Sequence, residues 1–130
     1  ASFPAAPYAQ ARRAYFESWD RRWADFEVPH FPNVTLGWDS TPRVPPGQTL
    51  ARGPYPHSPV LVGNTPGAVR EAVREAARRA LRHPVGRRIV TVYAWNEWTE
   101  GGVLEPEAEY GFGYLEAIRD EVRAANRPSP

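Results

Sequence analysis

The sequence predicts an α/β fold in which helices cover a parallel β-sheet. Three segments repeat apolar residues at helical spacing, and two short segments rich in β-branched and aromatic residues, 33–38 and 89–95, alternate with them. A polar cluster follows each of these predicted strands, at the edge where α/β sheets carry their functional groups. Two strands cannot form a stable parallel sheet alone, because each needs cover on both faces. We therefore expect residues 1–130 to be one partial domain of a longer chain.

The first helix is predicted over residues 7–26. Its apolar side chains recur every three or four residues, as on one face of an amphipathic helix. The residues of this face are Ala11, Tyr15, Trp19, Trp23 and Phe26. Pro29 and Pro32 end the helix, because the residue before a proline avoids helical geometry.

Two further helices are predicted. Thr65 is a favoured N-cap and Pro66 suits the first helical position, so one helix begins there and runs to His83. Its apolar stripe comprises Val69, Val73, Ala76, Ala77, Ala80 and Leu81. The last helix covers residues 111–126, and residues 127–130 form a frayed tail. The core stripe of the last helix is Tyr114 or Leu115, Ile118 and Val122. His30 and His83 lie at helix ends and are expected at the surface.

Residues 44–64 are rich in proline and glycine and are predicted to form a long loop. Compact domains seldom keep a loop of this length without a use for it. We expect it to form a wall of the functional site, with residues 59–62 packed down as an edge strand.

Composition argues against several classes of function. The net charge is +1, from 16 basic and 15 acidic residues in no block of one sign, so neither nucleic acid nor a membrane is an expected partner. No apolar run approaches the ~20 residues that span a bilayer. The chain has no cysteine, and its three histidines lack metal-ligand spacing, so we expect no disulfide, metal or cofactor. The compartment, cytoplasmic or secreted, is not indicated.

The strongest functional signal is the polar cluster after the second strand. Asn96, Glu97, Trp98 and Glu100 follow that strand directly, and a Gly-Gly pair comes next. If the chain curls at these glycines, the two carboxylates share one face. A paired acid and base is what glycosidic cleavage requires. The alternative is that either glutamate caps a helix or pairs with a surface arginine.

Aromatic side chains surround this cluster. Trp98 lies beyond the strand and between the two acids, so it is the preferred platform for stacking on a sugar ring. Tyr93 and Trp95 share one face of the strand, and at least one of them is predicted to be buried in the interior of the protein. Trp38 ends the other strand and is either a wall of a sugar subsite or core packing, since tryptophan is heavily buried on average.

Two polar residues are candidates for hydrogen bonding to sugar hydroxyls. Asp39 follows the first strand and either accepts such bonds or pairs with Arg43. Asn96 either holds a hydroxyl or ties down its own loop. Together with Trp98, Trp38 and Tyr93, they make up the predicted carbohydrate-binding residues.

These motifs resemble those of a known family. Residues 93–106 (YAWNEWTEGGVLEP) and 110–117 (YGFGYLEA) resemble the C-terminal end of glycoside hydrolase family 99-like proteins, including the WbsX-type proteins of bacterial polysaccharide loci. Residues 36–43 (LGWDSTPR) resemble the preceding strand-end motif of the same family. The resemblance spans residues 33–122. It implies a (β/α)8 TIM barrel, of which this chain would supply about the last two strands and three helices, with the rest of the barrel elsewhere in the parent chain.

The same resemblance implies an enzyme. In characterised family 99 endo-α-mannosidases, two glutamates of an Asn-Glu-Trp-x-Glu-Gly motif do the chemistry, and they fall on Glu97 and Glu100. By this analogy, Glu97 deprotonates the sugar 2-hydroxyl, which attacks the anomeric carbon to give a 1,2-anhydro intermediate. Glu100 acts as general acid and then as base toward water, with net retention. The family pattern has histidine where this chain has Thr99, so the sugar and its linkage are not carried over.

Three interpretations follow from the sequence. The first is a glycoside hydrolase that acts on a polysaccharide or glycan. An α-mannoside-like substrate is implied by the family resemblance alone. The second is a non-catalytic carbohydrate-binding barrel, or an accessory protein of polysaccharide biosynthesis. The third is a generic α/β fragment whose strand-end acids only cap loops.

The partial-domain interpretation predicts that the isolated 130-residue chain does not fold alone into a rigid domain. A parallel strand pair without cover on both faces lacks the burial that cooperative unfolding requires. We expect a broad thermal transition when circular dichroism is followed against temperature. A sharp cooperative transition would count against the interpretation.

Overall fold

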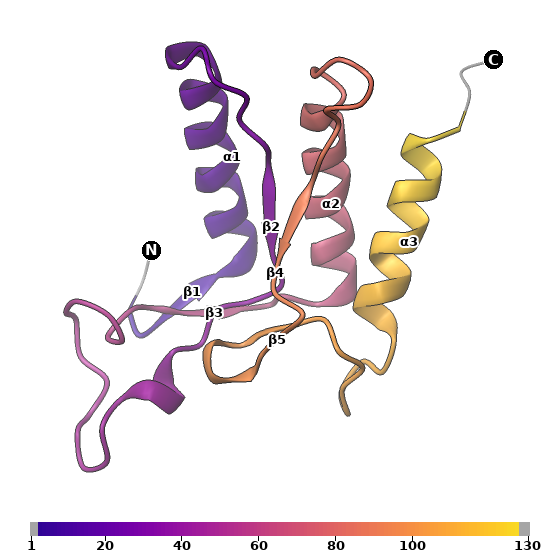
Figure 1. Cartoon of the computed structure of the whole chain (residues 1–130). Helices are drawn as coiled ribbons and strands as arrows, with labels where there is room; N and C mark the ends of the chain where they lie inside the picture. Colours follow the sequence, from indigo (N-terminus) through magenta and orange to yellow (C-terminus); the bar gives the residue numbers. More distant parts are fainter. Residues whose placement is uncertain (1–2, 128–130) are drawn as a thin grey trace.

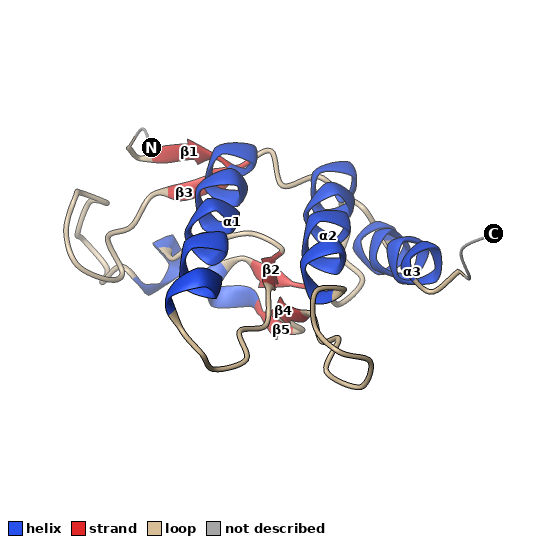
Figure 2. Cartoon of the chain, turned by 90° about the horizontal axis from the view of Figure 1, so that it is seen from above, coloured by secondary structure: helices blue, strands red, loops and turns tan. Residues whose placement is uncertain are grey.

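The computed structural model describes residues 3–127 (Figure 1). Within these residues, three helices stand side by side: α1 (Tyr8–Asp25), α2 (Pro66–Ala80) and α3 (Gly113–Ala125). Viewed from above, strands β2 (Asn33–Thr35) and β4 (Thr91–Tyr93) lie on one side of this row (Figure 2). The structure is thus a mixed α/β domain. Apart from Arg127, the predicted tail lies outside the described residues.

The central strand pair is parallel. β2 and β4 align Asn33 with Thr91, Val34 with Val92 and Thr35 with Tyr93. Both strands are shorter than predicted, although the Leu36 N–H still bonds to the Tyr93 carbonyl at 2.9 Å beyond the last pair. The chain then leaves the ladder at Gly37.

Short strands and turns surround this pair. The apolar piece predicted at residues 59–62 is confirmed as β3 (Val60–Val62), which pairs in parallel with β1 (Ala5–Pro7). Past β4, β5 (Asn96–Glu97) and β6 (Gly102–Val103) form a small antiparallel ribbon. Two 3₁₀ turns complete the fold, η1 (Thr41–Arg43) and η2 (Trp98–Glu100).

The start of α2 is as the sequence predicts. The Thr65 hydroxyl accepts a hydrogen bond from the Ala68 N–H at 3.3 Å, and Pro66 occupies the first turn. The buried stripe of this helix is Val69, Ala72, Val73, Ala76 and Ala80. Leu81 was expected in this stripe but is 45% exposed, because it lies just past the end of the helix.

Two other expectations about the helices are wrong. Val122 of α3 is exposed, because the buried stripe instead runs through Tyr114, Ala117 and Glu121. The Glu121 carboxylate accepts two hydrogen bonds from Arg74 of α2, at 2.8 and 3.0 Å, which satisfies its charge at the helix interface. Phe26 of the first helical face is also exposed, since α1 ends at Asp25.

His83 is buried rather than at the surface. Its Nε2 lies 3.1 Å from the His30 carbonyl oxygen. Its ring packs against Trp23 and Phe31, with centroid distances of 4.5 and 5.1 Å. Aromatic packing between the end of α1 and the turn after α2 therefore encloses this side chain.

The hydrophobic core lies between the helices and the β2–β4 pair. Its buried members are Tyr8, Phe16, Val34, Leu36, Val69, Ala72, Val73, Ala76 and Tyr114. Val34 and Leu36 alternate along the chain and face the helices, so Asn33 and Thr35 lie on the opposite face. This packing fixes the ends of β2 and β4 relative to each other.

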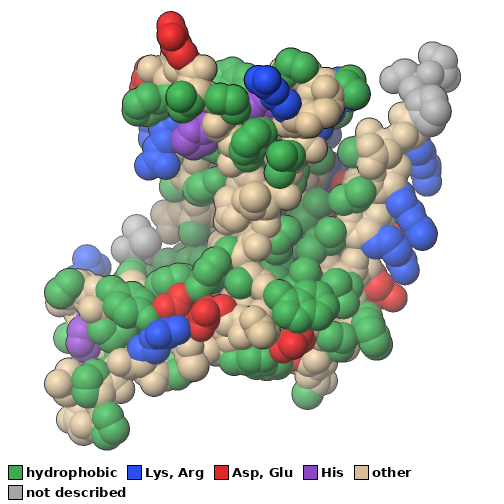
Figure 3. Space-filling view, in the orientation of Figure 1, with side chains coloured by type: hydrophobic (Ala, Val, Ile, Leu, Met, Phe, Trp, Pro, Cys, Tyr) green, Lys and Arg blue, Asp and Glu red, His purple; other side chains and the backbone are tan. Residues whose placement is uncertain are grey.

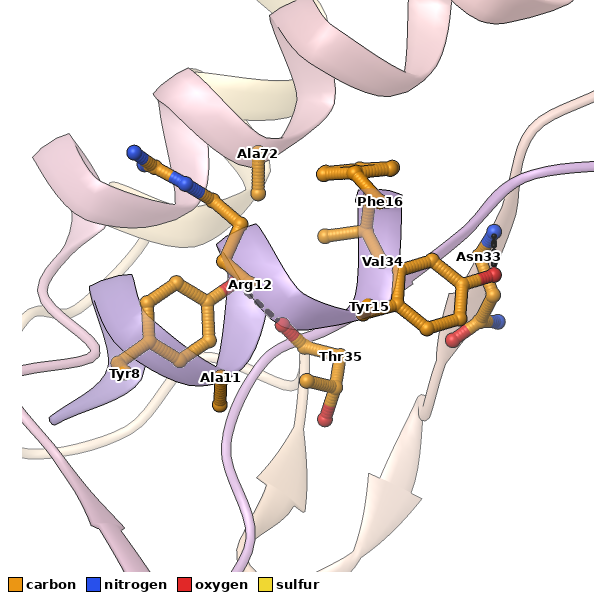
Figure 4. Close-up of a pocket in the computed structure, with 9 residues that line it drawn as sticks. All are labelled: Tyr8, Ala11, Arg12, Tyr15, Phe16, Asn33, Val34, Thr35 and Ala72. Atoms are coloured by element: carbon orange, nitrogen blue, oxygen red, sulfur yellow. Dashed lines mark hydrogen bonds between the residues drawn. The ribbon is translucent and has the colours of Figure 1, made fainter. Parts of the chain in front are cut away.

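The edge of β2 away from β4 is held by two tyrosines of α1 (Figure 4). The Tyr15 hydroxyl accepts a hydrogen bond from the Asn33 N–H at 2.9 Å, and the Tyr8 hydroxyl donates to the Thr35 carbonyl at 2.6 Å. A pocket of about 200 Å³ lies beside them, between α1 and β2. The two tyrosine hydroxyls thus form the hydrogen bonds that a neighbouring strand would otherwise form with this edge.

None of the helices described here is both long enough and apolar enough to cross a lipid bilayer.

Candidate functional site

The carboxyl ends of β2 and β4 bring both predicted polar clusters to the same edge of the molecule (Figure 1). The Asp39 N–H donates a hydrogen bond to the Glu100 carbonyl at 2.7 Å, which joins the segment after β2 to the segment after β4. The η1 and η2 turns therefore lie side by side. The expectation that the clusters meet at this edge is confirmed.

The chain curls between Glu97 and Gly101, which is the condition under which the sequence places both carboxylates on one face. The η2 turn ends at Gly101, whose φ of +66° lies in the left-handed region that favours glycine. A side chain there would approach the Asp39 N–H at 3.0 Å. At Gly37 a Cβ would lie only 2.6 Å from the Gly101 carbonyl oxygen, so the two strand-end segments touch through glycines. This tight turn places Glu97 and Glu100 on the same side.

Both carboxylates contact one guanidinium group. Arg43 Nη2 donates to Glu97 Oε1 at 2.8 Å, and Arg43 Nε lies 3.2 Å from Glu100 Oε1. The Glu97 side chain is 36% exposed and that of Glu100 only 12%. The sequence offered an ion pair with an arginine as the alternative to a carboxylate pair. The structure contains both, because the two glutamates lie together on the same arginine.

Glu100 is the more enclosed of the two acids. Its carboxylate accepts hydrogen bonds from the Tyr55 hydroxyl at 2.6 Å and from the Tyr93 hydroxyl. These bonds lower the pKa of Glu100 below its usual value, and the charge of Arg43 acts in the same direction against the effect of burial. These contacts therefore favour the ionised form of Glu100.

The pKa values of the two tyrosines are raised, whereas that of Glu100 is lowered. Burial, together with the hydrogen bond to Glu100, raises the pKa of Tyr93 to about 12. The bond to Glu100 is the main cause that raises the pKa of Tyr55. Both hydroxyls therefore stay protonated and act as donors to Glu100 at physiological pH.

Aromatic rings form one wall of this carboxylate site. The Trp38 ring centroid lies 6.2 Å from that of Tyr93 and 6.4 Å from that of Tyr55. The Trp38 indole N–H donates to the Ser58 hydroxyl at 2.7 Å, which fixes the ring against the long loop. Residues 44–64 thus contribute Tyr55 and Ser58, consistent with the predicted wall.

The remaining predicted residues are placed differently. Asp39 accepts a hydrogen bond from the Thr41 N–H at 2.9 Å and shapes its own turn, while Arg43 binds the glutamates instead. Asn96 is exposed in the β5–β6 ribbon. Trp98 is 54% exposed and lines a separate hollow rather than the space beside Arg43.

Sequence reasoning missed two members of the site. Arg43 was considered only as a partner of Asp39, and Tyr55 was not singled out within its loop. The one signal for Arg43 was its place in the strand-end motif, and nothing in the sequence distinguished Tyr55 from other loop aromatics.

In the space-filling view, acidic and basic side chains lie next to each other within a largely hydrophobic lower surface (Figure 3).

Within residues 3–127, no group of three or more acidic, histidine or cysteine side chains is arranged to hold a metal ion.

Comparison with known protein families assigns this chain to one of them. The family model described as "Glycosyltransferase WbsX" matches residues 5–118. The chain belongs to the WbsX glycosyltransferase family. The WbsX match includes both strand-end motifs and the first half of α3.

Two relatives of this WbsX family chain are similar over most of its length. They are the proteins named "Uncharacterized protein WxcX" from Xanthomonas campestris pv. campestris strains B100 and ATCC 33913, each 34% identical over 96 residues. The match covers 73% of this chain but spans only 12% of the length of either relative. No solved structure matches the chain.

Substituting Gly101 with alanine tests whether the η2 turn depends on a tight approach. Gly101→Ala and Gly86→Ala both place alanine in a left-handed conformation, which costs about 1–2 kcal/mol. Only at Gly101 does the new Cβ also meet Asp39, whereas nothing lies within 4 Å of that position at Gly86. We expect Gly101→Ala to lower the free energy of unfolding more than Gly86→Ala, as measured by denaturant titration of the natural full-length protein. Equal losses would show that the turn is not tightly packed.

Proposed function

We propose that this chain supplies the carboxylate pair of a retaining glycoside hydrolase that acts on a polysaccharide or glycan. The observation that carries the proposal is that Glu97 and Glu100 bind the same Arg43 guanidinium at the carboxyl ends of two parallel strands. The aromatic wall of Trp38 and Tyr93 beside them suits the apolar faces of a sugar ring. Membership of the WbsX family supports a carbohydrate substrate.

The proposed reaction uses the two glutamates in the roles that the family 99 resemblance implies. Glu97 takes the proton of the sugar 2-hydroxyl, and that oxygen attacks the anomeric carbon as the glycosidic bond breaks. Glu100 gives a proton to the leaving oxygen. Glu100 then removes a proton from water, which opens the 1,2-anhydro ring with net retention. Glu97 returns its proton to the 2-oxygen in this step, so both glutamates regain their starting protonation states. No metal or organic cofactor takes part.

The contacts of Glu100 place a condition on this scheme. A general acid must be protonated, whereas Tyr55, Tyr93 and Arg43 hold the free carboxylate ionised. We propose that bound substrate draws these donors away from Glu100 and so raises its pKa before proton transfer. The raised pKa of the Tyr55 and Tyr93 hydroxyls means that they keep their protons during this change.

We further propose that the domain is the C-terminal portion of a (β/α)8 barrel whose other strands belong to the rest of the parent chain. The parallel β2–β4 pair, with helices on one side, supports this arrangement. The great length of the WxcX relatives leaves room for the missing strands.

A second candidate function is glycosyl transfer, which the description of the matching family favours. The same intermediate could react with a sugar hydroxyl in place of water, with Glu100 as the base. Transfer would lengthen a glycan, and hydrolysis would shorten it. Product analysis with and without an added acceptor sugar therefore separates the two.

Amide variants of the glutamates test the proposed chemistry. Glu97→Gln and Glu100→Gln keep the side-chain shape, but an amide can neither act as an acid or base nor carry a negative charge. We expect each to reduce product release from α-mannans or bacterial exopolysaccharides by about 10²–10⁴-fold in the natural full-length protein, as is usual for loss of an acid or base. Liquid chromatography of released sugars gives the rate.

Glu116→Gln is the matched control, because Glu116 is exposed on α3 and distant in sequence from the turn. Its activity is expected to equal that of the wild type. If turnover survives both site variants, the pair is not catalytic. If no substrate is turned over but sugar binding persists in all variants, the protein is a carbohydrate-binding or accessory protein instead.

The pH dependence of kcat/KM tests the role of Glu100. Tyr55→Phe removes the hydrogen bond that contributes most to the lowered pKa of Glu100, so that pKa rises. A general acid works below its pKa, so we expect the alkaline limb of the profile to move to higher pH. Tyr15→Phe, whose hydroxyl serves the Asn33 N–H, should leave both limbs in place. Movement of the acidic limb instead would assign Glu100 the role of base.

A further inference from the structure

A hollow of about 230 Å³ lies against the η2 turn, and neither Arg43 nor the two site glutamates line it. Trp98, Tyr110, Asn64, Gly101, Glu107 and Glu109 are among the residues that line it. Because η2 carries both Trp98 and Glu100, the hollow and the carboxylate site are separated by a single turn. Its volume is below the ~300 Å³ at which drug-sized pockets begin, so it suits one sugar ring.

The aromatic side chains of this hollow are held in place before any ligand binds. The Trp98 indole N–H donates to Glu105 Oε2 at 2.8 Å, which fixes the ring while it stays 54% exposed. Tyr110 packs edge to face against Tyr114, with ring centroids 5.6 Å apart. An exposed indole that is already oriented loses little conformational entropy when it stacks on a ligand.

The rim of the hollow is shaped by a carboxylate and by backbone groups. Glu107 accepts hydrogen bonds from the Glu109 N–H at 2.6 Å and the Tyr110 N–H at 2.7 Å. Tyr114 also lines the hollow and donates a hydrogen bond to the Asn64 carbonyl at 2.5 Å. The lining therefore combines an aromatic face with polar oxygens, the two kinds of group that bind a pyranose ring.

The charge around the hollow selects among sugars. Glu105, Glu107 and Glu109 form no ion pair with any basic side chain in the described part of the chain. Like charges placed together across an interface are unfavourable. A uronic acid or another anionic sugar would meet this repulsion, and an uncharged sugar would not.

We propose that this hollow is a second sugar subsite, which binds an uncharged residue of the same glycan chain that reaches Glu97 and Glu100. The proposal rests on the proposed function, because it takes the carboxylate site as the point of cleavage. It implies that the substrate crosses the η2 turn and occupies both sides of it. Longer oligosaccharides should then be better substrates than short ones.

A ladder of manno-oligosaccharides, from two to six residues, tests the subsite in the natural full-length protein. We expect kcat/KM to rise with length in the wild type, and Trp98→Ala to remove about three- to tenfold of that gain, the range expected for loss of one aromatic contact. Trp98→Phe keeps a ring but loses the indole N–H, so its gain in kcat/KM with length should lie between those of the wild type and Trp98→Ala. Trp95→Ala is the matched control, since Trp95 is also 54% exposed but does not line the hollow.

Binding measured by calorimetry in the Glu97→Gln background separates this proposal from the proposed function. If no substrate is turned over but affinity still rises with length and depends on Trp98, the subsite stands and the hydrolase fails. If turnover occurs but Trp98→Ala reduces it equally at every length, or no more than Trp95→Ala does, the subsite is wrong. Tighter binding of galacturonate oligomers than of manno-oligosaccharides would overturn the choice of an uncharged sugar.

Discussion

The contact of Arg43 with both Glu97 and Glu100 is the interaction on which this end of the molecule depends. Two carboxylates three residues apart in one tight turn repel each other, and a shared guanidinium offsets that repulsion while fixing where both point. Arg43 itself is placed by η1, which lies against η2 through the hydrogen bond between Asp39 and Glu100. Local turns, strand pairing and charge therefore support one another at a single place.

The parallel pairing of β2 and β4 makes that contact possible. The core between the helices and strands sets the register, and the register brings the two strand-end segments together. Close approach favours glycine at both positions: at Gly37 a Cβ would lie 2.6 Å from the Gly101 carbonyl oxygen, and Gly101 combines a φ of +66° with a Cβ position only 3.0 Å from the Asp39 nitrogen. A change in strand register by one residue would turn every side chain on these segments to the other face.

The electrostatics of the site distinguish its two acids. Glu100 receives two tyrosine hydroxyls and is largely enclosed, whereas Glu97 is more exposed and accepts a hydrogen bond from the Thr99 hydroxyl at 2.8 Å. Thr99 stands where the family 99 pattern has histidine, and it donates to Glu97 without adding a group that titrates near neutral pH. The site thus keeps two carboxylates but differs from the pattern next to one of them.

The sequence by itself determined the three helices and the cap at Thr65, because helical periodicity and capping act over a few residues. It also placed both polar clusters at one edge, since the carboxyl ends of parallel strands always meet there. Tertiary structure alone decided that Arg43 binds Glu97, 54 residues away, and that Tyr55 binds Glu100, 45 residues away. It also decided that His83 is buried and that Trp98 faces a separate hollow. These contacts depend on how the strands and the long loop pack, which no local pattern specifies.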